Sequence, residues 1–219
     1  MSEKVRQRQD ARREAVLAAA ARIFAARGYQ ATSMHDLAAE VGLTKPSLYH
    51  YVRSKEEVLV TLYEAVLRDS TAAVAAIEAA ASTAHAALRE VVVERVAYTC
   101  ENQALLRVFF EEEAGLPREQ LEDVLQARRA YEDAVIALAL RAADDGALEF
   151  RVPARIYVNT LLGAANWVYK WYDPDGRLAP RELGDQVASV LLGPPAAPAD
   201  QSHARTASDP ARPSAVPTN

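Results

Sequence analysis

The chain has 219 residues, half of them hydrophobic, and its 25 Lys or Arg against 30 Asp or Glu give a net charge of −5. A chain of this length and apolar content can bury one ordinary core or two small ones, which excludes disorder throughout, and no apolar run is long enough for a membrane span or a secretory signal. Cys100 is the single cysteine, which excludes an internal disulfide and a cysteine-based zinc site, so we expect a globular, cytoplasmic protein with no bound metal.

The sequence predicts an all-helical fold. Hairpin turns between alternating segments are absent, glycine is scarce, and alanine, leucine, glutamate and arginine dominate. The first helix is expected from about residue 9 to 26, because Val16, Ala20 and Phe24 repeat at the spacing of one buried helical stripe. Gly28 follows at the position of a C-terminal stop.

Two short helices joined by a tight turn are predicted over residues 32 to 51. Thr32 or Ser33 can cap the first of them, and Gly42 supplies the turn. Thr44 can cap the second helix, whose first turn holds a proline where no N–H is needed. This order of elements is a helix-turn-helix.

The second helix of this motif has an apolar inner side and a polar outer side. At 100° per residue, Leu48 and Tyr51 point inward, toward the first helix of the pair. Lys45, Tyr49 and His50 cover the opposite arc. A helix of this size fits the major groove of B-DNA, where its first side chains reach base edges and flanking groups hold phosphates. The alternative interpretation is that these residues only form solvated turns of an ordinary helical bundle.

The charge is divided unevenly along the chain. Residues 1 to 55 carry 10 Lys or Arg against 5 Asp or Glu, whereas residues 56 to 219 carry 15 against 25. A basic N-terminal part can neutralise phosphates, and an acidic remainder that faces away from DNA keeps a dimer soluble. We therefore expect double-stranded DNA as a partner of the N-terminal part.

A long helix is expected to begin at Ser54, where Ser54 and Glu57 have the spacing of a capping box, and to link the two parts of the chain. Further helices are predicted at about residues 83 to 101, 103 to 114, 118 to 143, 154 to 172 and 180 to 192. Residues 194 to 219 are rich in proline, alanine, serine and threonine and nearly lack large apolar residues, so we expect them to be disordered.

The stretch from about Arg8 to Leu67 resembles the DNA-binding domain of the TetR family of bacterial repressors. The resemblance rests on the run Arg-Ile-Phe-Ala-Ala-Arg-Gly-Tyr-Gln-Ala-Thr-Ser that begins at Arg22, on Leu-Tyr-His-Tyr from Leu48, and on Ser-Lys-Glu-Glu-Val-Leu from Ser54. The chain departs from the family at Val52, where the family commonly has phenylalanine. We expect this difference to affect packing only.

The resemblance implies a DNA-binding domain over residues 8 to 55 and a helical effector-binding and dimerisation domain over residues 56 to 193. By their chemistry, Lys45 can donate to guanine or a phosphate, the Tyr49 ring can touch a thymine methyl, and Lys55 can clamp a phosphate. The expected DNA contacts are Thr32, Ser33, Thr44, Lys45, Pro46, Ser47, Tyr49, His50 and Lys55.

Two predicted helices of the C-terminal part carry stripes that suit a homodimer interface. Apolar residues at spacings of four and three line one side of the helices at 118 to 143 and 154 to 172. The TetR resemblance implies dimerisation through the last two long helices, and a core within one chain is the alternative interpretation. The residues assigned to the interface are Val124, Tyr131, Val135, Leu161, Ala164 and Val168.

The segment from Asn166 to Leu178 resembles the corresponding stretch in regulators of fatty-acid and steroid catabolism that respond to acyl-CoA thioesters. This resemblance implies a small-molecule effector, an acyl-CoA, and no cofactor. A repressor of an efflux or degradation operon that responds to drugs or aromatic compounds is the alternative, and aromatic residues at helical spacing can also be core. The predicted ligand-binding residues are Tyr98, Phe109, Phe110, Asn166, Trp167 and Trp171.

An enzyme and an effector-free activator or architectural DNA binder are the rival classes of function. The sequence has no glycine-rich phosphate loop, no Gly-x-Ser-x-Gly nucleophile elbow and no histidine-based catalytic constellation. We therefore expect a transcriptional regulator without catalytic residues, a repressor that leaves its operator when the effector binds.

Overall fold

A computed structural model describes residues 3–194, which form helices joined by loops, with no strand within that range. The all-α prediction is confirmed for this part of the chain. The predicted disordered tail, residues 194 to 219, lies outside the described residues except for Pro194. The helices are α1 (Glu3–Arg27), α2 (Met34–Glu40), α3 (Lys45–Leu48), α4 (Lys55–Ala80), α5 (Ala84–Glu101), α6 (Gln103–Glu111), α7 (Arg118–Asp144), α8 (Ala154–Trp167) and α9 (Pro180–Leu192), with short 3₁₀ turns η1 (Glu113–Gly115) and η2 (Val168–Lys170).

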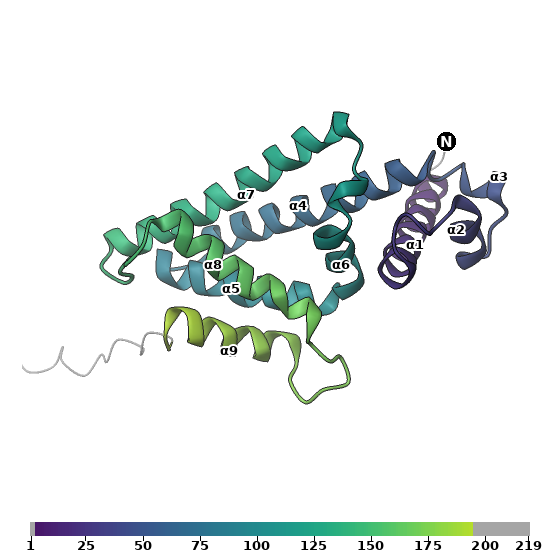
Figure 1. Ribbon diagram of the computed structural model, residues 1–219. Helices are drawn as coiled ribbons and strands as arrows, with labels where there is room; N and C mark the ends of the chain where they lie inside the picture. The colour runs from purple at the N-terminus through teal and green to yellow at the C-terminus, as the bar shows by residue number, and fades with distance from the viewer. Residues whose placement is uncertain (1–2, 195–219) are drawn as a thin grey trace, which may run out of the picture.

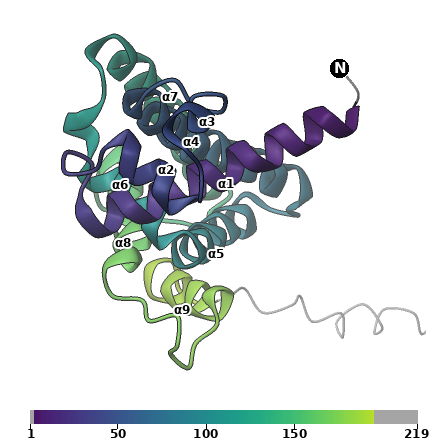
Figure 2. The same ribbon diagram turned by 90° about the vertical axis from the view of Figure 1, so that its right-hand side faces the viewer.

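The molecule is elongated, with α1, α2 and α3 at one end and the remaining helices behind them (Figure 1). We call α1 to α3 the head and α4 to α9 the body. Helix α4 runs from the head into the body, where α5 packs against α4, α7, α8 and α9 (Figures 1 and 2). Helix α6 lies between the two parts and contacts α1. No helix in residues 3–194 combines the length and apolar character that a bilayer span requires.

The helices of the head begin at side-chain caps. The Ser33 hydroxyl accepts a hydrogen bond from Asp36 N at 3.2 Å, and the Asp36 carboxylate accepts from Ser33 N at 2.8 Å, which is a capping box. The box predicted at Ser54 is only half formed. Ser54 Oγ accepts from Glu57 N at 3.1 Å, but the Glu57 carboxylate accepts from Arg53 N at 2.8 Å instead of returning to Ser54.

The second helix of the predicted helix-turn-helix is shorter than expected. It spans Lys45–Leu48, and the chain continues through tight turns in which Tyr51 N donates to the Leu48 carbonyl at 2.9 Å. The helix ends early because the next residues turn inward to bury Val52 in the core of the head. Two other predicted helices also divide. The segment at 103 to 114 forms α6 and η1, and the segment at 154 to 172 forms α8 and η2, because their last turns tighten into 3₁₀ geometry.

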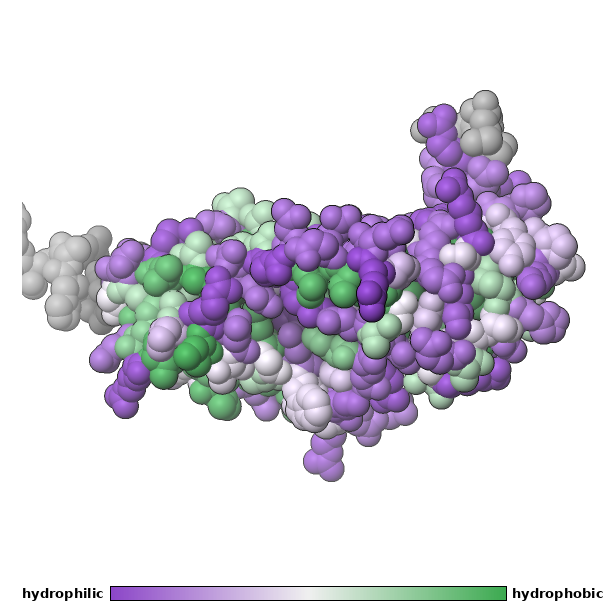
Figure 3. All heavy atoms as spheres, turned by 45° about the horizontal axis from the view of Figure 1, so that its top comes forward, coloured by the Kyte–Doolittle hydropathy of each residue, from purple (hydrophilic) through white to green (hydrophobic). Residues whose placement is uncertain are grey.

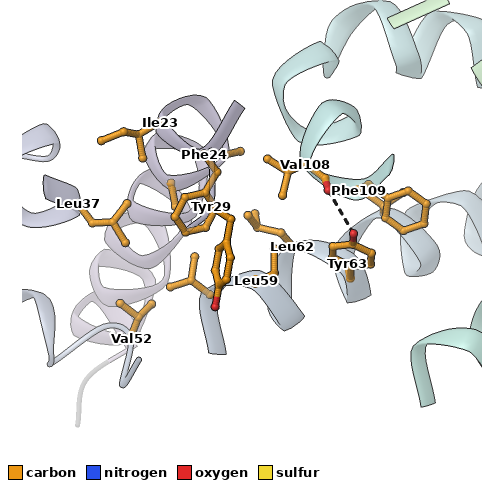
Figure 4. Close-up of a cluster of buried hydrophobic side chains, with 14 of the residues drawn as sticks. Ile23, Phe24, Tyr29, Leu37, Val52, Leu59, Leu62, Tyr63, Val108 and Phe109 are labelled. Carbon is orange, nitrogen blue, oxygen red and sulfur yellow. Dashed lines mark hydrogen bonds between the residues drawn. The ribbon is translucent and has the colours of Figure 1, made fainter. Parts of the chain in front are cut away.

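The core of the head continues into the body without a break (Figure 4). Phe24 and Tyr29 pack edge to face with ring centroids 5.2 Å apart, next to Leu59 of α4. One turn further along α4, the Tyr63 hydroxyl donates to the Val108 carbonyl of α6 at 3.2 Å. Because this core is close-packed, a movement of α6 or α4 would shift the side chains that hold the helix-turn-helix.

Candidate DNA-binding and effector sites

The cap and first turn of α3 place a row of side chains at the surface of the head. Thr44 Oγ1 accepts a hydrogen bond from Ser47 N at 3.3 Å and lies 2.9 Å from Ser47 Oγ. Leu48 is fully buried and anchors the turn, whereas Tyr49 on the other side is 45% exposed. The exposed residues of this turn are Thr44, Lys45, Pro46, Tyr49 and His50. An aromatic ring and a cation presented beside a capped helix end suit base edges and phosphates.

Two of the predicted DNA contacts at the start of α2 lie in different environments. Ser33 is exposed, and hydrogen bonds from its hydroxyl and its N–H lower the pKa of the Asp36 carboxyl, so Asp36 is charged at neutral pH. Thr32 is only 2% exposed, and its hydroxyl donates to the Gly28 carbonyl at 2.9 Å. The structure therefore gives Thr32 a role inside the head, where it ties α2 to the end of α1, and no surface toward DNA.

Lys55 is held by the protein to a greater extent than the sequence suggests. Its ammonium donates to the Tyr29 carbonyl at 2.9 Å and lies 4.3 Å from the centroid of the Tyr29 ring. Lys55 is thus a link between the start of α4 and the loop after α1. The sequence has no signal for this link, because the two residues are 26 positions apart.

Two arginines of α1 also support the motif, and the sequence analysis did not single them out. Arg12 donates to the Val41 carbonyl at 3.3 Å, and Arg13 donates to the Tyr51 carbonyl at 3.3 Å. They satisfy carbonyl groups that follow the two motif helices, at the C-cap of α2 and in the turn after α3. Their only signal in the sequence was their place in the polar first part of α1, before the buried stripe that begins at Val16.

The body contains a cavity of about 270 Å³ between α4, α5 and α7. Its walls include Val74 and Ile77 of α4, Val91 of α5 and Tyr131 of α7, so most of the lining is apolar. Tyr98, one of the predicted ligand residues, lines this cavity. Burial raises the pKa of the Tyr98 hydroxyl to about 12, so the hydroxyl is a neutral hydrogen-bond donor at neutral pH.

A second cavity of about 240 Å³ adjoins the first and reaches α8. Phe109, Phe110 and Asn166, three more of the predicted ligand residues, line it. The two cavities share Ser70, Arg95 and Tyr131 as walls. The two tryptophans line neither cavity: Trp167 is 59% and Trp171 is 54% exposed. The structure therefore separates the predicted ligand residues into a cavity group and an exposed aromatic pair.

Arg95 is the polar centre of the two cavities, and the sequence analysis missed it. The side chain is 6% exposed, its Nε donates to Asn166 Oδ1 at 2.5 Å, and its Nη1 donates to Ser70 Oγ at 2.8 Å. The signal in the sequence was an arginine within the largely apolar stretch from residue 91 to 100.

The stripe residues assigned to the dimer interface are mostly core residues of one chain. Val124, Tyr131, Val135, Leu161 and Val168 are buried within the protomer, and only Ala164 is exposed. A buried side chain has no surface left for a partner, so the intrachain interpretation holds for those five positions.

A different row of α8 is exposed. Ile156, Ala164 and Trp167 face solvent at helical spacing, and a Cβ added at Gly163 would meet no atom within 4 Å. Figure 3 shows apolar side chains at the surface of the body, at the end away from the head. Leu140 of α7 and Val152, which precedes α8, are also exposed. Small residues between large apolar ones allow close approach of a second helix.

Titratable side chains do not gather into a metal site in residues 3–194. No group of three His, Cys, Asp or Glu in this range has a geometry that could hold a metal ion.

Family models match most of the described chain. Residues 16–62 match the model described as bacterial regulatory proteins, tetR family, and residues 81–194 match the model described as tetracyclin repressor-like, C-terminal domain.

Individual relatives match most of the chain. The HTH-type transcriptional repressor KstR2 of Mycobacterium tuberculosis is 29% identical over 199 residues, which cover 84% of this chain and 92% of the relative. A TetR/AcrR-family regulator from Thermobifida fusca is 31% identical over 83% of this chain and 96% of its own, with a TM-score of 0.63. AibR, solved in complex with isovaleryl coenzyme A and operator DNA, is 26% identical over 84% of this chain and 99% of its own, with a TM-score of 0.74.

Proposed function

Because the chain belongs to the TetR family of DNA-binding transcriptional repressors, we propose that it holds its operator through the α3 face and releases it when a small acyl compound enters the body. Members of this family bind operator DNA as dimers and respond to small molecules, so the fold supplies the framework for each step. We assign the chain no catalytic activity, and we place its action on the chromosome in the cytoplasm.

The proposed DNA surface is the exposed side of α3 with the capped start of α2. Lys45, Tyr49 and His50 would contact the major groove and its phosphates, and the Thr44 hydroxyl would donate to the DNA backbone at the start of α3. Ser33 would lie beside this backbone at the start of α2, where its N–H and hydroxyl already donate to the Asp36 carboxylate. Pro46 and Ser47 complete the surface. We propose Lys55 as a positioning residue for this surface, because its ammonium already binds the Tyr29 carbonyl.

The proposed dimer surface is the exposed row on α8. Ala164 remains from the interface that the sequence predicts, and Ile156, Gly163 and Trp167 replace its buried members. Two copies related by a two-fold axis would bring these rows together and would present two heads to an inverted repeat.

The proposed effector site is the pair of adjoining cavities, and the buried polar centre at Arg95 within apolar walls is the observation that carries it. Concave apolar sites with a few convergent polar groups are typical of ligand pockets. AibR was solved with isovaleryl coenzyme A, which favours an acyl compound, an acyl-CoA among them, over the alternative class of drugs and aromatic compounds.

The effector proposal is tested by titrating fatty acids, acyl-CoAs and planar aromatic drugs in parallel while operator release is followed by mobility shift. Both tryptophans of the chain, Trp167 and Trp171, lie within five residues of the cavity residue Asn166, so fluorescence reports ligand binding in the same samples. We expect acyl compounds to change both signals. Release by aromatic drugs alone would favour the alternative class, and no release by any compound would contradict an effector in the body.

A further inference from the structure

Arg95 carries a charge that the described protein does not neutralise. Its side chain is almost wholly buried, and no carboxylate oxygen in residues 3–194 lies within 4.0 Å of its guanidinium nitrogens. A guanidinium remains protonated at any physiological pH, and removing an unpaired one from water is strongly unfavourable. Buried arginines are ordinarily paired with an acid, so this position requires another source of negative charge.

The groups that contact Arg95 are neutral and leave part of the guanidinium without a partner. Asn166 accepts from Nε and Ser70 accepts from Nη1, while the Tyr98 ring lies 5.8 Å from the guanidinium carbon. Nη2 makes no hydrogen bond with any described residue, and Arg95 lines both cavities. The N–H groups of Nη2 are therefore available to donate to an oxygen of a ligand in the cavities.

The acidic residues around the first cavity have other partners. Asp69 pairs with Arg68 at 3.1 Å, and Glu94 pairs with Arg181 at 3.0 Å. Within each pair the two charges neutralise each other, so neither carboxylate compensates the charge of Arg95.

The same holds for the second cavity. Arg128 pairs with Glu113 at 2.6 Å, and Glu132 lies beyond ion-pair distance from Arg95. Among the charged residues that line the two cavities, Arg95 is the buried cation without a counter-charge in the described chain.

We propose that Arg95 binds a carboxylate of the effector within these cavities. The proposal rests on the proposed function, because it concerns the same site in the body, and it narrows the ligand to an amphipathic compound with a carboxylate at its buried end. Val74, Ile77 and Val91 would cover the apolar part of that compound. A free organic acid and a CoA thioester of a dicarboxylic acid both present this group.

Matched pairs of ligands test the proposal directly. Hexanoic, octanoic, decanoic and dodecanoic acid are each compared with the corresponding methyl ester, and the mono-CoA thioesters of the matching dicarboxylic acids form a third arm. Affinity is measured from tryptophan fluorescence and from the rise in melting temperature. The variant is Arg95→Met, which keeps the volume and removes the charge, and the control is Arg129→Met, which removes an exposed arginine paired with Glu122 on α7.

We expect the wild type to bind one or more acids, or their CoA thioesters, at least about tenfold more tightly than the neutral ester, as a charge-assisted hydrogen bond does. Arg95→Met should lose this preference, and Arg129→Met should keep it. Without ligand, Arg95→Met should melt no lower than the wild type, because it removes an uncompensated buried charge. A purely structural arginine would instead give a less stable variant that keeps the same preference for the acid.

Three results would overturn the proposal: neither the acids nor the thioesters bind the wild type more tightly than the neutral esters, Arg95→Met keeps the same preference, or no acid or thioester of the series binds. The free acids and the thioesters identify which source supplies the carboxylate. Operator release is measured separately. An acid that binds through Arg95 without releasing DNA would contradict the proposed function alone, and release by a compound indifferent to Arg95→Met would contradict this inference alone.

Discussion

At the scale of single residues, two lysines of similar sequence context have different roles. Lys45 is exposed beside the cap of α3 and makes no hydrogen bond with a described residue, whereas Lys55 binds the Tyr29 carbonyl and lies over its ring. The ammonium of Lys45 is therefore available to a phosphate or a guanine. The ammonium of Lys55 links α4 to the loop after α1 and so contributes mainly to the stability of the head.

We predict that Lys45→Ala weakens operator binding and leaves the melting temperature unchanged. Each lost phosphate contact makes the slope of log affinity against log salt less negative by about 0.9, so a dimer that loses two contacts should have a slope less negative by about 1.8. Lys55→Met should instead lower the melting temperature, with a cost of about 1 kcal/mol. Salt titrations by fluorescence anisotropy and thermal melts separate the two. An unchanged slope in Lys45→Ala would exclude a phosphate contact there.

The single cysteine is predicted to be inert in the folded protein. Burial raises the pKa of the Cys100 thiol to about 11, so only about one molecule in ten thousand carries the thiolate at pH 7. Iodoacetamide should label the protein in urea and react at least about a hundredfold more slowly with the native protein. Labelling at the same rate in both states would show that the thiol is accessible in solution.

Among the elements, the turn from Glu112 to Gly115 joins the body to the DNA-binding part, in addition to α4 and α6. Glu112 accepts a hydrogen bond from Tyr29 N at 2.9 Å, and the neighbouring Glu113 pairs with Arg128 of the second cavity. A Cβ on Gly115 would lie 2.7 Å from the Tyr29 ring and 3.1 Å from Leu59. The wall of the second cavity at Arg128 and the position of Tyr29 are thus connected through one short turn.

We predict that Gly115→Ala separates this turn from the head. The added methyl group has no room, so the variant should lose about 1 to 3 kcal/mol of stability and a melt should show it. Glu112→Gln should keep the fold and change the ratio of operator affinities with and without effector, which measures the coupling. Glu119→Gln, on the exposed start of α7, is the control. An unchanged ratio in Glu112→Gln would place the coupling elsewhere.

The sequence predicts the ends of helices well where a capping or turn residue marks them locally. Thr44, Ser54 and Gly28 mark helix ends that the structure confirms, and the predicted limits of α9 agree with the observed ones. The lengths of α3 and α8 were wrong, because tertiary packing decides where a last turn tightens. Val52 is buried in the core after α3, and no pattern in the neighbouring sequence predicts this burial.

At the scale of the whole molecule, the main error of the sequence analysis concerns the partner surface. Spacings of three and four identify one side of a helix that is buried, but they do not tell whether the covering surface belongs to the same chain. Leu161 and Val135 are covered by their own protomer. Arg95 was missed for a related reason, since only the assembled body shows that four helices enclose it.

We predict that Ala164→Glu gives a folded monomer. The side chain is exposed in the protomer, so the charge is harmless there and unfavourable only against a second α8. Leu161→Glu, one turn away and buried, should unfold the protomer instead. Light scattering and circular dichroism distinguish the two outcomes. A dimeric Ala164→Glu would move the interface to another surface of the body.

Operator recognition by a dimer through α3 can be tested by selecting bound fragments from random double-stranded DNA. We predict enrichment of an inverted repeat whose half-sites lie about one helical turn, or a multiple of it, apart, and loss of that enrichment in Tyr49→Ala with the fold retained. Recovery of no common sequence by the wild type, or of the same inverted repeat by Tyr49→Ala and Lys45→Ala, would contradict recognition through this face.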